Sequence, residues 1–376
     1  MRSFHVRISP ETTVSSVLTN QAENIIREHN PALRSPRNLL QPLSAHTVYD
    51  LFLVYIIMCD EEMTAGFLNA SAENVYDEKS AFSQTEHNIV AVYLITAGVV
   101  SLSSNIVVLL MFVKFRELRT ATNAIIINLA FTDIGVAGIG YPMSAASDLH
   151  GSWKFGYMGC QIYAALNIFF GMASIGLLTV VAIDRYLTIC RPDVGQKLSA
   201  LSYTLLIVAA WMNAVFWSAM PIIGWAGYAP DPTGATCTIN WRNNDASFVS
   251  YTMTVIIVNF IIPLSVMFYC YYNVSVTVKR FKMSIIMIVM FLAAWSPYSI
   301  VCLWASFGDP KKIPAPMAII APLFAKSSTF YNPCIYVIAN KKFRRAITGM
   351  LRCQTRQRMN ISNQLPMTAS SVPLNP

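Results

Sequence analysis

Long apolar runs separated by short polar segments make up most of this chain. Seven of them approach or exceed the length of about 20 residues that a helix needs to cross the hydrocarbon core of a bilayer. The runs cover residues 89–113, 124–146, 163–188, 203–225, 248–271, 283–306 and 317–339. Strings such as IIMIVMFLAAW do not alternate between apolar and polar positions, as the strands of a membrane barrel would. The pattern predicts an all-α membrane protein, with a seven-transmembrane helix bundle over residues 89–339.

The composition and the placement of charge agree with this pattern. Hydrophobic residues make up 55% of the chain and charged residues 12%, whereas soluble domains carry roughly 25% charge. Lysine and arginine gather in the short segments after the first, third and fifth runs and directly after the last one. Cytoplasmic loops carry such an excess, so we expect a multi-pass plasma membrane protein with its N-terminus outside and its C-terminus in the cytoplasm. The net charge of +8 then reflects topology, and no nucleic-acid partner is expected.

The two ends of the chain differ from the predicted bundle. Residues 1–88 contain no run of spanning length and predict a largely disordered extracellular segment, in which residues 1–62 form a flexible extension or an upstream start. Asn69 begins an Asn-Ala-Ser glycosylation acceptor on the outer side. After the last run, residues 340–353 predict a short amphipathic cytoplasmic helix, and residues 354–376 predict a disordered tail.

Lys326 stands in the middle of the seventh run, and that run holds no acidic residue to pair with it. An ammonium at the centre of a spanning helix costs about 2.5–3.5 kcal/mol on insertion scales, so such a lysine indicates a function. Desolvation favours the neutral amine, which can attack a carbonyl and form a Schiff base. The alternatives are a lysine that reaches an interface, for which this one lies too deep, or one that pairs with a distant carboxylate. The sequence favours a covalent site for an aldehyde.

The cysteines divide between outer segments and predicted helices. Cys160 and Cys237 both lie in outer segments, which face an oxidising compartment, and they form the pair that we expect to be bridged. Thiols within or near the helices are expected only to pack. Cys353 follows the basic amphipathic stretch and is a candidate for palmitoylation, with a free cytoplasmic thiol as the equal alternative.

A series of landmarks occurs in order along the seven runs. They are Asn105, the string NLAFTD ending at Asp133, Asp184-Arg185-Tyr186, Trp211, Pro263 with Tyr271, Trp295-Ser296-Pro297, and Asn332-Pro333-Cys334-Ile335-Tyr336. Over residues 85–353 the chain thereby resembles the rhodopsin-like G-protein-coupled receptors. A lysine seven residues before the proline of the last motif narrows the resemblance to the opsins. The strings YPMSAASDLHGSWKFGY and APDPTGATCTINW are most similar to an opsin of the retinal pigment epithelium, which implies expression in that tissue.

The resemblance implies a site for retinal, in the 11-cis or the all-trans form, with Lys326 holding the aldehyde. Tyr163 stands where visual pigments carry a glutamate counterion, so the resemblance makes Asp231, in the second outer loop, the counterion. Its flanking prolines also fit a simple turn. The resemblance further implies a lining in which Phe260 lies toward the ring and Gly171 leaves space for a methyl group, although aromatic residues at helical spacing more often form plain core. The other implied lining residues are Trp295, Tyr298 and Phe330.

The resemblance also implies a conformational switch at the inner side of the bundle. Arg185 would be held by Asp184 at rest and released when the sixth helix moves, although a solvated ion pair explains the same two residues. Asp133 is expected to form hydrogen bonds with Asn105 and Asn332. The implied switch residues are Asp184, Arg185, Tyr186, Asp133, Asn332, Pro333, Tyr336 and Tyr271.

Three functions compete on this sequence. The first is a light sensor that switches a heterotrimeric G protein. The second, which the resemblance favours, is a photoreceptor acting as a retinal photoisomerase or retinoid store, in which light turns all-trans into 11-cis retinal. The third is a ligand receptor in which the lysine is incidental. Residues 272–282 must end the fifth helix, turn and begin the sixth, so we expect weak coupling to a G protein.

Overall fold

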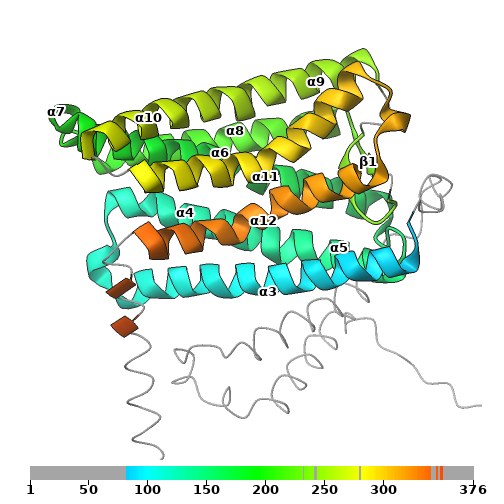
Figure 1. The fold of residues 1–376 in the computed structure, drawn as a ribbon, viewed down its shortest axis with the longest axis horizontal. Helices are drawn as coiled ribbons and strands as arrows, with labels where there is room; N and C mark the ends of the chain where they lie inside the picture. Colours follow the sequence, from blue (N-terminus) through cyan, green and yellow to red (C-terminus); the bar gives the residue numbers. More distant parts are fainter. Residues whose placement is uncertain are drawn as a thin grey trace, which may run out of the picture. The chain divides into compact units, whose positions relative to one another are not determined.

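The computed structural model describes residues 82–231, 233–240, 244–278 and 281–339, together with 344–345 and 348–349. Most of these residues form long helices that lie side by side along a common direction, and a small hairpin lies at one end of them (Figure 1). The long helices and helix segments are α3 (Gln84–Lys114), α4 (Ala121–Gly135), α5 (Tyr141–His150), α6 (Gly156–Cys190), α8 (Ala200–Ile223), α9 (Ala246–Ile256), α10 (Ile262–Val278), α11 (Phe281–Phe307) and α12 (Ala315–Ala339). The connections contain the short helices η4 (Arg116–Leu118), α7 (Pro192–Gly195) and η7 (Pro310–Lys312).

These segments build the seven predicted spans. A π-helical segment, η5 (Val136–Gly140), joins α4 to α5, and a second one, η6 (Ile257–Ile261), joins α9 to α10. Six spans in the described part of the chain are long and apolar enough to cross a membrane. The seventh span, α12, carries Lys326 and several hydroxyl side chains, and it is held in the bundle by contacts with α11, α3 and α4.

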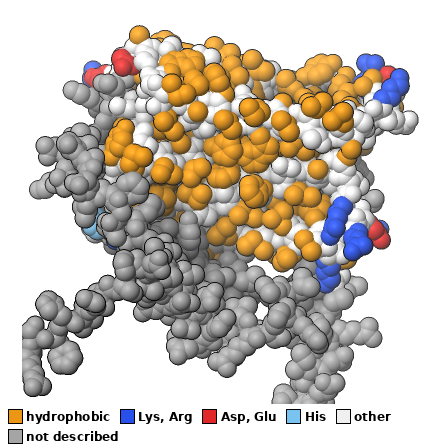
Figure 2. Space-filling view, turned by 180° about the vertical axis from the view of Figure 1, so that it is seen from behind, with side chains coloured by type: hydrophobic (Ala, Val, Ile, Leu, Met, Phe, Trp, Pro, Cys, Tyr) orange, Lys and Arg blue, Asp and Glu red, His pale blue; other side chains and the backbone are white. Residues whose placement is uncertain are grey.

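The surface suits a lipid environment. On the face that Figure 2 shows, apolar side chains cover the flank of the bundle, and the charged side chains of the described residues gather toward its ends. Large apolar side chains with more than half of their surface exposed include Ile89, Leu201, Ile223 and Phe307. Apolar patches of this extent are rare on soluble monomers, whereas hydrocarbon tails contact them without penalty. The lipid bilayer is therefore the surrounding in which this bundle is stable.

Helix α6 is the central helix of the bundle and packs against α4, α8 and α10. Small residues allow its close approach to α8, since a Cβ atom added at Gly176 would lie 3.0 Å from the Cβ of Ala210. α6 therefore reaches neighbours on several sides, and its inward face can contribute to a shared interior site.

The hairpin belongs to the connection between α8 and α9. Strand β1 (Tyr228–Pro230) pairs antiparallel with β2 (Cys237–Ile239), and Pro230 lies opposite Cys237. The chain enters this connection at Gly224, whose φ of 112° ends α8 in a left-handed conformation that glycine adopts without strain. The hairpin lies over one end of the bundle interior, where its second strand contacts α6.

Some expectations fall outside the described residues. These are the segment 1–62, the glycosylation acceptor at Asn69, Cys353 and the tail 354–376. Within 340–353, the described residues 344–345 and 348–349 are helical. The domain boundaries expected for both ends therefore stay predictions.

Candidate functional site

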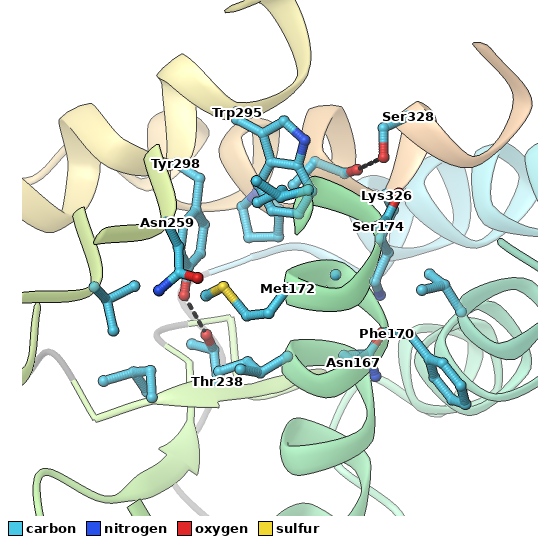
Figure 3. A pocket seen from close by; sticks show the side chains of 18 of the residues that line it. Asn167, Phe170, Met172, Ser174, Thr238, Asn259, Trp295, Tyr298, Lys326 and Ser328 are labelled. Atoms are coloured by element: carbon cyan, nitrogen blue, oxygen red, sulfur yellow. Dashed lines mark hydrogen bonds between the residues drawn. The ribbon is translucent and has the colours of Figure 1, made fainter. Parts of the chain in front are cut away.

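A cavity lies inside the bundle, between α6, the fifth span, α11, α12 and the hairpin. Figure 3 places Lys326 at one side of it and Asn259 at the other, with Trp295 and Met172 between them in this view. Residues Thr236 to Ile239 of the hairpin cover part of the cavity. Most of the wall is aromatic or aliphatic, so the cavity fits an apolar ligand with a few fixed polar contacts.

Lys326 extends from α12 to the wall of the cavity, where its side chain is half-buried. Its Nζ donates hydrogen bonds to Tyr163 Oη at 2.7 Å, to Ser144 Oγ at 2.8 Å and to the carbonyl oxygen of Gly140 at 3.2 Å. Nζ also lies 5.4 Å from the centroid of the Tyr163 ring. These acceptors are uncharged, and they hold the amine at the wall of an apolar cavity.

Three hydroxyl groups form a cluster around the amine, which we call the hydroxyl cluster: Ser144, Tyr163 and Thr236. Tyr163 Oη hydrogen-bonds with Ser144 Oγ and, at 2.8 Å, with Thr236 Oγ1 of the hairpin. Ser144 Oγ and Thr236 Oγ1 are 3.2 Å apart. The cluster joins α5, α6 and the hairpin to Lys326 of α12. The sequence analysis singled out Tyr163 only as a neutral residue at a counterion position, and it missed Ser144 and Thr236.

Asp231 lies directly after β1 and is 2% exposed. Its Oδ1 accepts hydrogen bonds from Thr233 Oγ1 at 2.6 Å and from Thr233 N at 3.2 Å. Its backbone N–H donates to the carbonyl oxygen of Thr236 at 2.9 Å, which ties this carboxylate to the hydroxyl cluster through the hairpin. Burial raises the pKa of the Asp231 carboxyl to about 6; hydrogen bonding by Thr233 opposes that rise, and the charge of Asp148 adds to it. The role of Asp231 as counterion stays a prediction.

A second buried acid, Asp148, lies on α5 one helical turn from Ser144. Its Oδ1 is 2.8 Å from Nδ1 of His87 on α3, and both side chains are buried. Asp148 also interacts electrostatically with Lys326 and with Asp231. The sequence analysis missed this pair, although the spacing of Ser144 and Asp148 by four residues on one predicted helix was a usable signal.

Most of the implied lining residues do line the cavity. The side chains of Trp295, Tyr298 and Phe260 contribute to its wall. Tyr298 Oη hydrogen-bonds with Thr238 Oγ1 of the hairpin at 2.9 Å, and Phe260 stacks on Phe291 with ring centroids 5.9 Å apart. Gly171 also belongs to the lining, and a Cβ atom there would lie 3.1 Å from the Trp295 ring. The space beside Gly171 is thus filled by the Trp295 ring in this structure.

Phe330 was expected to line the cavity, and this expectation is wrong, since the residue lies outside the cavity lining. It packs in a cluster with Val136, Ala137 and Tyr141 of the second span. The cavity-facing stripe of α12 includes Pro322, Ala325, Lys326 and Thr329, with Lys326 at its edge. A step of four residues advances a helix by about 40° beyond a full turn, which carries Phe330 past that edge.

The disulfide expected between Cys160 and Cys237 is confirmed, with the two Cα atoms 5.4 Å apart. It links the start of α6 to β2 across a sequence separation of 77 residues. Because β2 belongs to the cavity cover, the bridge fixes the hairpin over Lys326 and holds Thr236 next to Tyr163.

The contacts of Asp184 and Arg185, near the C-terminal end of α6, differ in part from the expectation. Asp184 Oδ2 lies 3.7 Å from Arg185 Nε, while Asp184 Oδ1 accepts a hydrogen bond from Tyr203 Oη on α8 at 2.6 Å. The tyrosine on α8 is therefore the closer partner of the buried carboxylate, and the Arg185 side chain is 40% exposed. Tyr186 packs against Tyr269 of α10, with ring centroids 5.5 Å apart.

The expected polar contacts around Asp133 are found in part. Asn332 Nδ2 donates to Asp133 Oδ2 at 2.9 Å. Asn105 instead donates to the backbone carbonyl oxygens of Ser101 and Thr329, at 3.0 and 2.9 Å, so it joins α3 to α12 directly. Both hydrogens of Asn105 Nδ2 are donated to these carbonyl oxygens, so Nδ2 does not make the expected hydrogen bond with Asp133.

A second, smaller cavity lies between α6, α10, α11 and α12. Tyr271 and Asn332 line it, and Trp295 and Ser328 line both cavities. Trp295 thus contacts both cavities, and a ligand that moved its ring would change the wall of both. Pro333 lies buried in α12, and the side chain of Tyr336 is outside the described residues. The switch roles of these residues stay predictions.

The sequence is similar to proteins of known kind. Residues 104–336 match the family described as 7 transmembrane receptor (rhodopsin family). The chain is 68% identical over 327 residues to the human visual pigment-like receptor peropsin, covering 82% of this chain and 97% of the human protein. The mouse protein of that name is 65% identical over 319 residues, with coverage of 80% and 95%. The crystal structure of squid rhodopsin aligns with a TM-score of 0.67 at 26% identity, covering 78% of this chain and 93% of the squid chain.

This chain belongs to the rhodopsin family of seven-transmembrane receptors. Within that family it is an opsin similar to peropsin, since the identity extends over nearly the whole length of two peropsins. The predicted fold class and the predicted resemblance are thereby confirmed. The expectation of weak coupling to a G protein gains no support from these relatives.

Proposed function

We propose that this protein is a light-sensitive pigment that binds retinal covalently at Lys326 and isomerises it from all-trans to 11-cis when it absorbs light. The observation that carries the proposal is the position of the Lys326 amine at the wall of an aromatic cavity inside an opsin fold. The wall is apolar, as a polyene requires, and the lysine is the group that condenses with an aldehyde. The apolar wall therefore suits the polyene of retinal, and the Lys326 amine suits its aldehyde.

The chemistry at Lys326 is a condensation. Lys326 would hold retinal through a covalent bond from Nζ to the aldehyde carbon, and the aldehyde oxygen would leave as water with the two hydrogens of the amine. When bound, retinal supplies the absorbance and the bond that light isomerises. The chain supplies the rest: Tyr163 and Ser144 orient the nitrogen by accepting its hydrogen bonds, and Asp231 provides the negative charge that favours its protonated form.

The experiment that tests this function compares retinal isomers before and after illumination. The protein is expressed and loaded in the dark with all-trans retinal, and a parallel sample is loaded with 11-cis retinal. Each sample is illuminated, and its retinal is extracted as the oxime. We expect a visible absorption band in the dark and a rise in 11-cis retinal after light. A band without any 11-cis product would contradict the photoisomerase role, and failure to form a pigment with either isomer would contradict retinal binding itself.

Light-driven switching of a heterotrimeric G protein is the second candidate, because the family is one of G-protein-coupled receptors. α10 ends at Val278 and α11 begins at Phe281, so the connection between the fifth and sixth spans is short. A nucleotide-exchange assay on the illuminated pigment tests this candidate. Lengthening the connection after Val278 tests the effect of the short connection: faster exchange in the lengthened variant would mean that it restrains α11, and equal exchange would mean that it does not.

We place the protein in the plasma membrane with the hairpin and its disulfide outside, because the basic residues gather at the opposite side of the spans. Expression in the retinal pigment epithelium follows from the likeness to peropsin and belongs to the same proposal. Antibody staining of unpermeabilised cells against a tag placed before Gln84 tests the orientation. Staining that requires permeabilisation would reverse it.

A further inference from the structure

The side of the cavity away from Lys326 carries a polar side chain that the proposed function does not use. Asn259 belongs to η6, the π-helical segment of the fifth span, and it is 4% exposed. It lines the cavity, and Figure 3 shows it on the side opposite Lys326. π-helical segments often occur at functional sites. An amide in this place is costly unless both of its ends have partners.

A chain of hydrogen bonds fixes which way round this amide lies. Trp217 Nε1 can only donate, and it donates to Asn213 at 2.9 Å, so the Asn213 atom that it meets is the oxygen. The other end of Asn213 is then its nitrogen, which donates to Asn259 at 2.7 Å. The Asn259 atom that accepts this hydrogen bond is therefore its oxygen, and the end that remains is the Nδ2 donor.

Asn259 Nδ2 is buried and has no hydrogen-bond acceptor among the residues that the structure describes. A buried donor without an acceptor loses its hydration without compensation. A ligand atom that accepts a hydrogen bond would remove this penalty. Since a retinoid bound at Lys326 extends across the cavity, the part of it near Asn259 is its ring, which is entirely hydrocarbon in retinal itself.

We propose that Asn259 recognises an oxygen atom on the ring of the bound retinoid, so that the site prefers ring-oxidised retinals, the keto and hydroxy derivatives, to retinal. This inference rests on the proposed function, since it requires the aldehyde to be held at Lys326. The hydrogen bond is made by Nδ2 to the keto or hydroxyl oxygen, and it involves no covalent step. Met172 and Phe260 supply the apolar wall around that contact.

The test is a competition in the dark between all-trans retinal and all-trans 4-oxoretinal, both in excess over the purified full chain, and a second competition with 3-hydroxyretinal. Bound retinoids are fixed by borohydride reduction and counted by mass spectrometry of the digested protein. We expect at least one ring-oxidised retinal to be preferred by roughly threefold to tenfold, the effect of one neutral hydrogen bond. Asn259→Leu, which is similar in size, should abolish this preference.

Asn167→Leu is the matched control, because Asn167 is a second amide in the same cavity wall. Its Nδ2 already donates to the carbonyl oxygen of Tyr163 at 2.8 Å, and its buried Oδ1 is the end that has no partner among the described residues. An acceptor cannot bind a keto oxygen, so Asn167→Leu should keep the preference for 4-oxoretinal. Loss of the preference in this variant as well would contradict the assignment to Asn259.

A vibrational measurement keeps the inference testable if a variant does not fold. In the wild-type protein loaded with 4-oxoretinal, the infrared stretch of the ring carbonyl should fall below its value in an apolar solvent, as hydrogen bonding requires. An unshifted band, together with equal binding of all three retinoids, would overturn the inference while leaving retinal binding intact. If no retinoid is fixed to the chain at all, the proposed function fails and this inference fails with it.

Discussion

Removing the hydroxyl group of Tyr163 is the most informative single change near Lys326. Tyr163 Oη is the closest acceptor of Lys326 Nζ, at 2.7 Å, and the same oxygen bonds to Ser144 and Thr236. Tyr163→Phe keeps the ring, which lies 5.4 Å from Nζ, and deletes only the oxygen. We expect the Schiff base of the pigment to hold its proton less tightly in this variant.

The size of the effect follows from the strength of the hydrogen bond. A hydrogen bond to a charged group contributes about 1.5–3 kcal/mol. One pKa unit corresponds to about 1.36 kcal/mol. The pKa of the Schiff base should therefore fall by about 1 to 2 units in Tyr163→Phe, and less if Ser144 takes over as acceptor at its distance of 2.8 Å.

The assay is a pH titration of the dark absorption spectrum, in which the visible band of the protonated Schiff base gives way to an ultraviolet band. Tyr251→Phe is a matched control, because Tyr251 also lines the cavity but donates its hydroxyl hydrogen to the carbonyl oxygen of Trp217 at 2.7 Å. The titration midpoint should move in Tyr163→Phe and stay in place in Tyr251→Phe. An unchanged midpoint in Tyr163→Phe, or an equal shift in both variants, would refute the reasoning.

Two further predictions concern the hairpin that covers the cavity. Asp231→Asn should lower the Schiff-base pKa, moving absorption at neutral pH toward the ultraviolet; an unchanged visible spectrum from pH 5 to 9 would contradict Asp231 as counterion. In the wild type, the carboxyl gains a proton as pH falls through its pKa, which is about 6 before the imine charge lowers it, so the visible band should move below about pH 6. In Asp231→Asn this carboxyl step should be missing, and acidification should only bring back the visible band as the imine gains its proton. Cys237→Ser should remove a bridge that typically contributes about 2–4 kcal/mol and leave misfolded protein inside the cell, whereas a normal pigment yield would count against that role.

The bundle was predictable because a membrane span has a length and composition that no other element shares. The disulfide was predictable because Cys160 and Cys237 stood in two connections between spans that were predicted to face outside, and Lys326 because a charge within an apolar run is costly. Each of these features can be recognised from a single residue or from the length of an apolar run, without knowing how the helices pack.

The partners of Lys326 were not predictable, because they depend on how separate helices turn toward one another. Ser144 and Thr236 are common hydroxyl residues, and their approach to Tyr163 follows from the π-helical segment η5 and from the hairpin register. Phe330 was misplaced because helical spacing alone does not give the edge of the stripe that faces the cavity. The orientation of Asn259 required the neighbouring helix α8, which the sequence does not place.

The most direct test of the central claim locates the covalent bond. The pigment is formed with retinal in the dark, reduced with borohydride and digested, and the modified peptide is sequenced by mass spectrometry. The account predicts that the retinyl group lies on Lys326, that Lys326→Ala abolishes it, and that Lys312→Ala, a change at an exposed lysine in the connection between α11 and α12, leaves it in place. A retinyl group on any other residue, or one that persists in Lys326→Ala, would contradict the account.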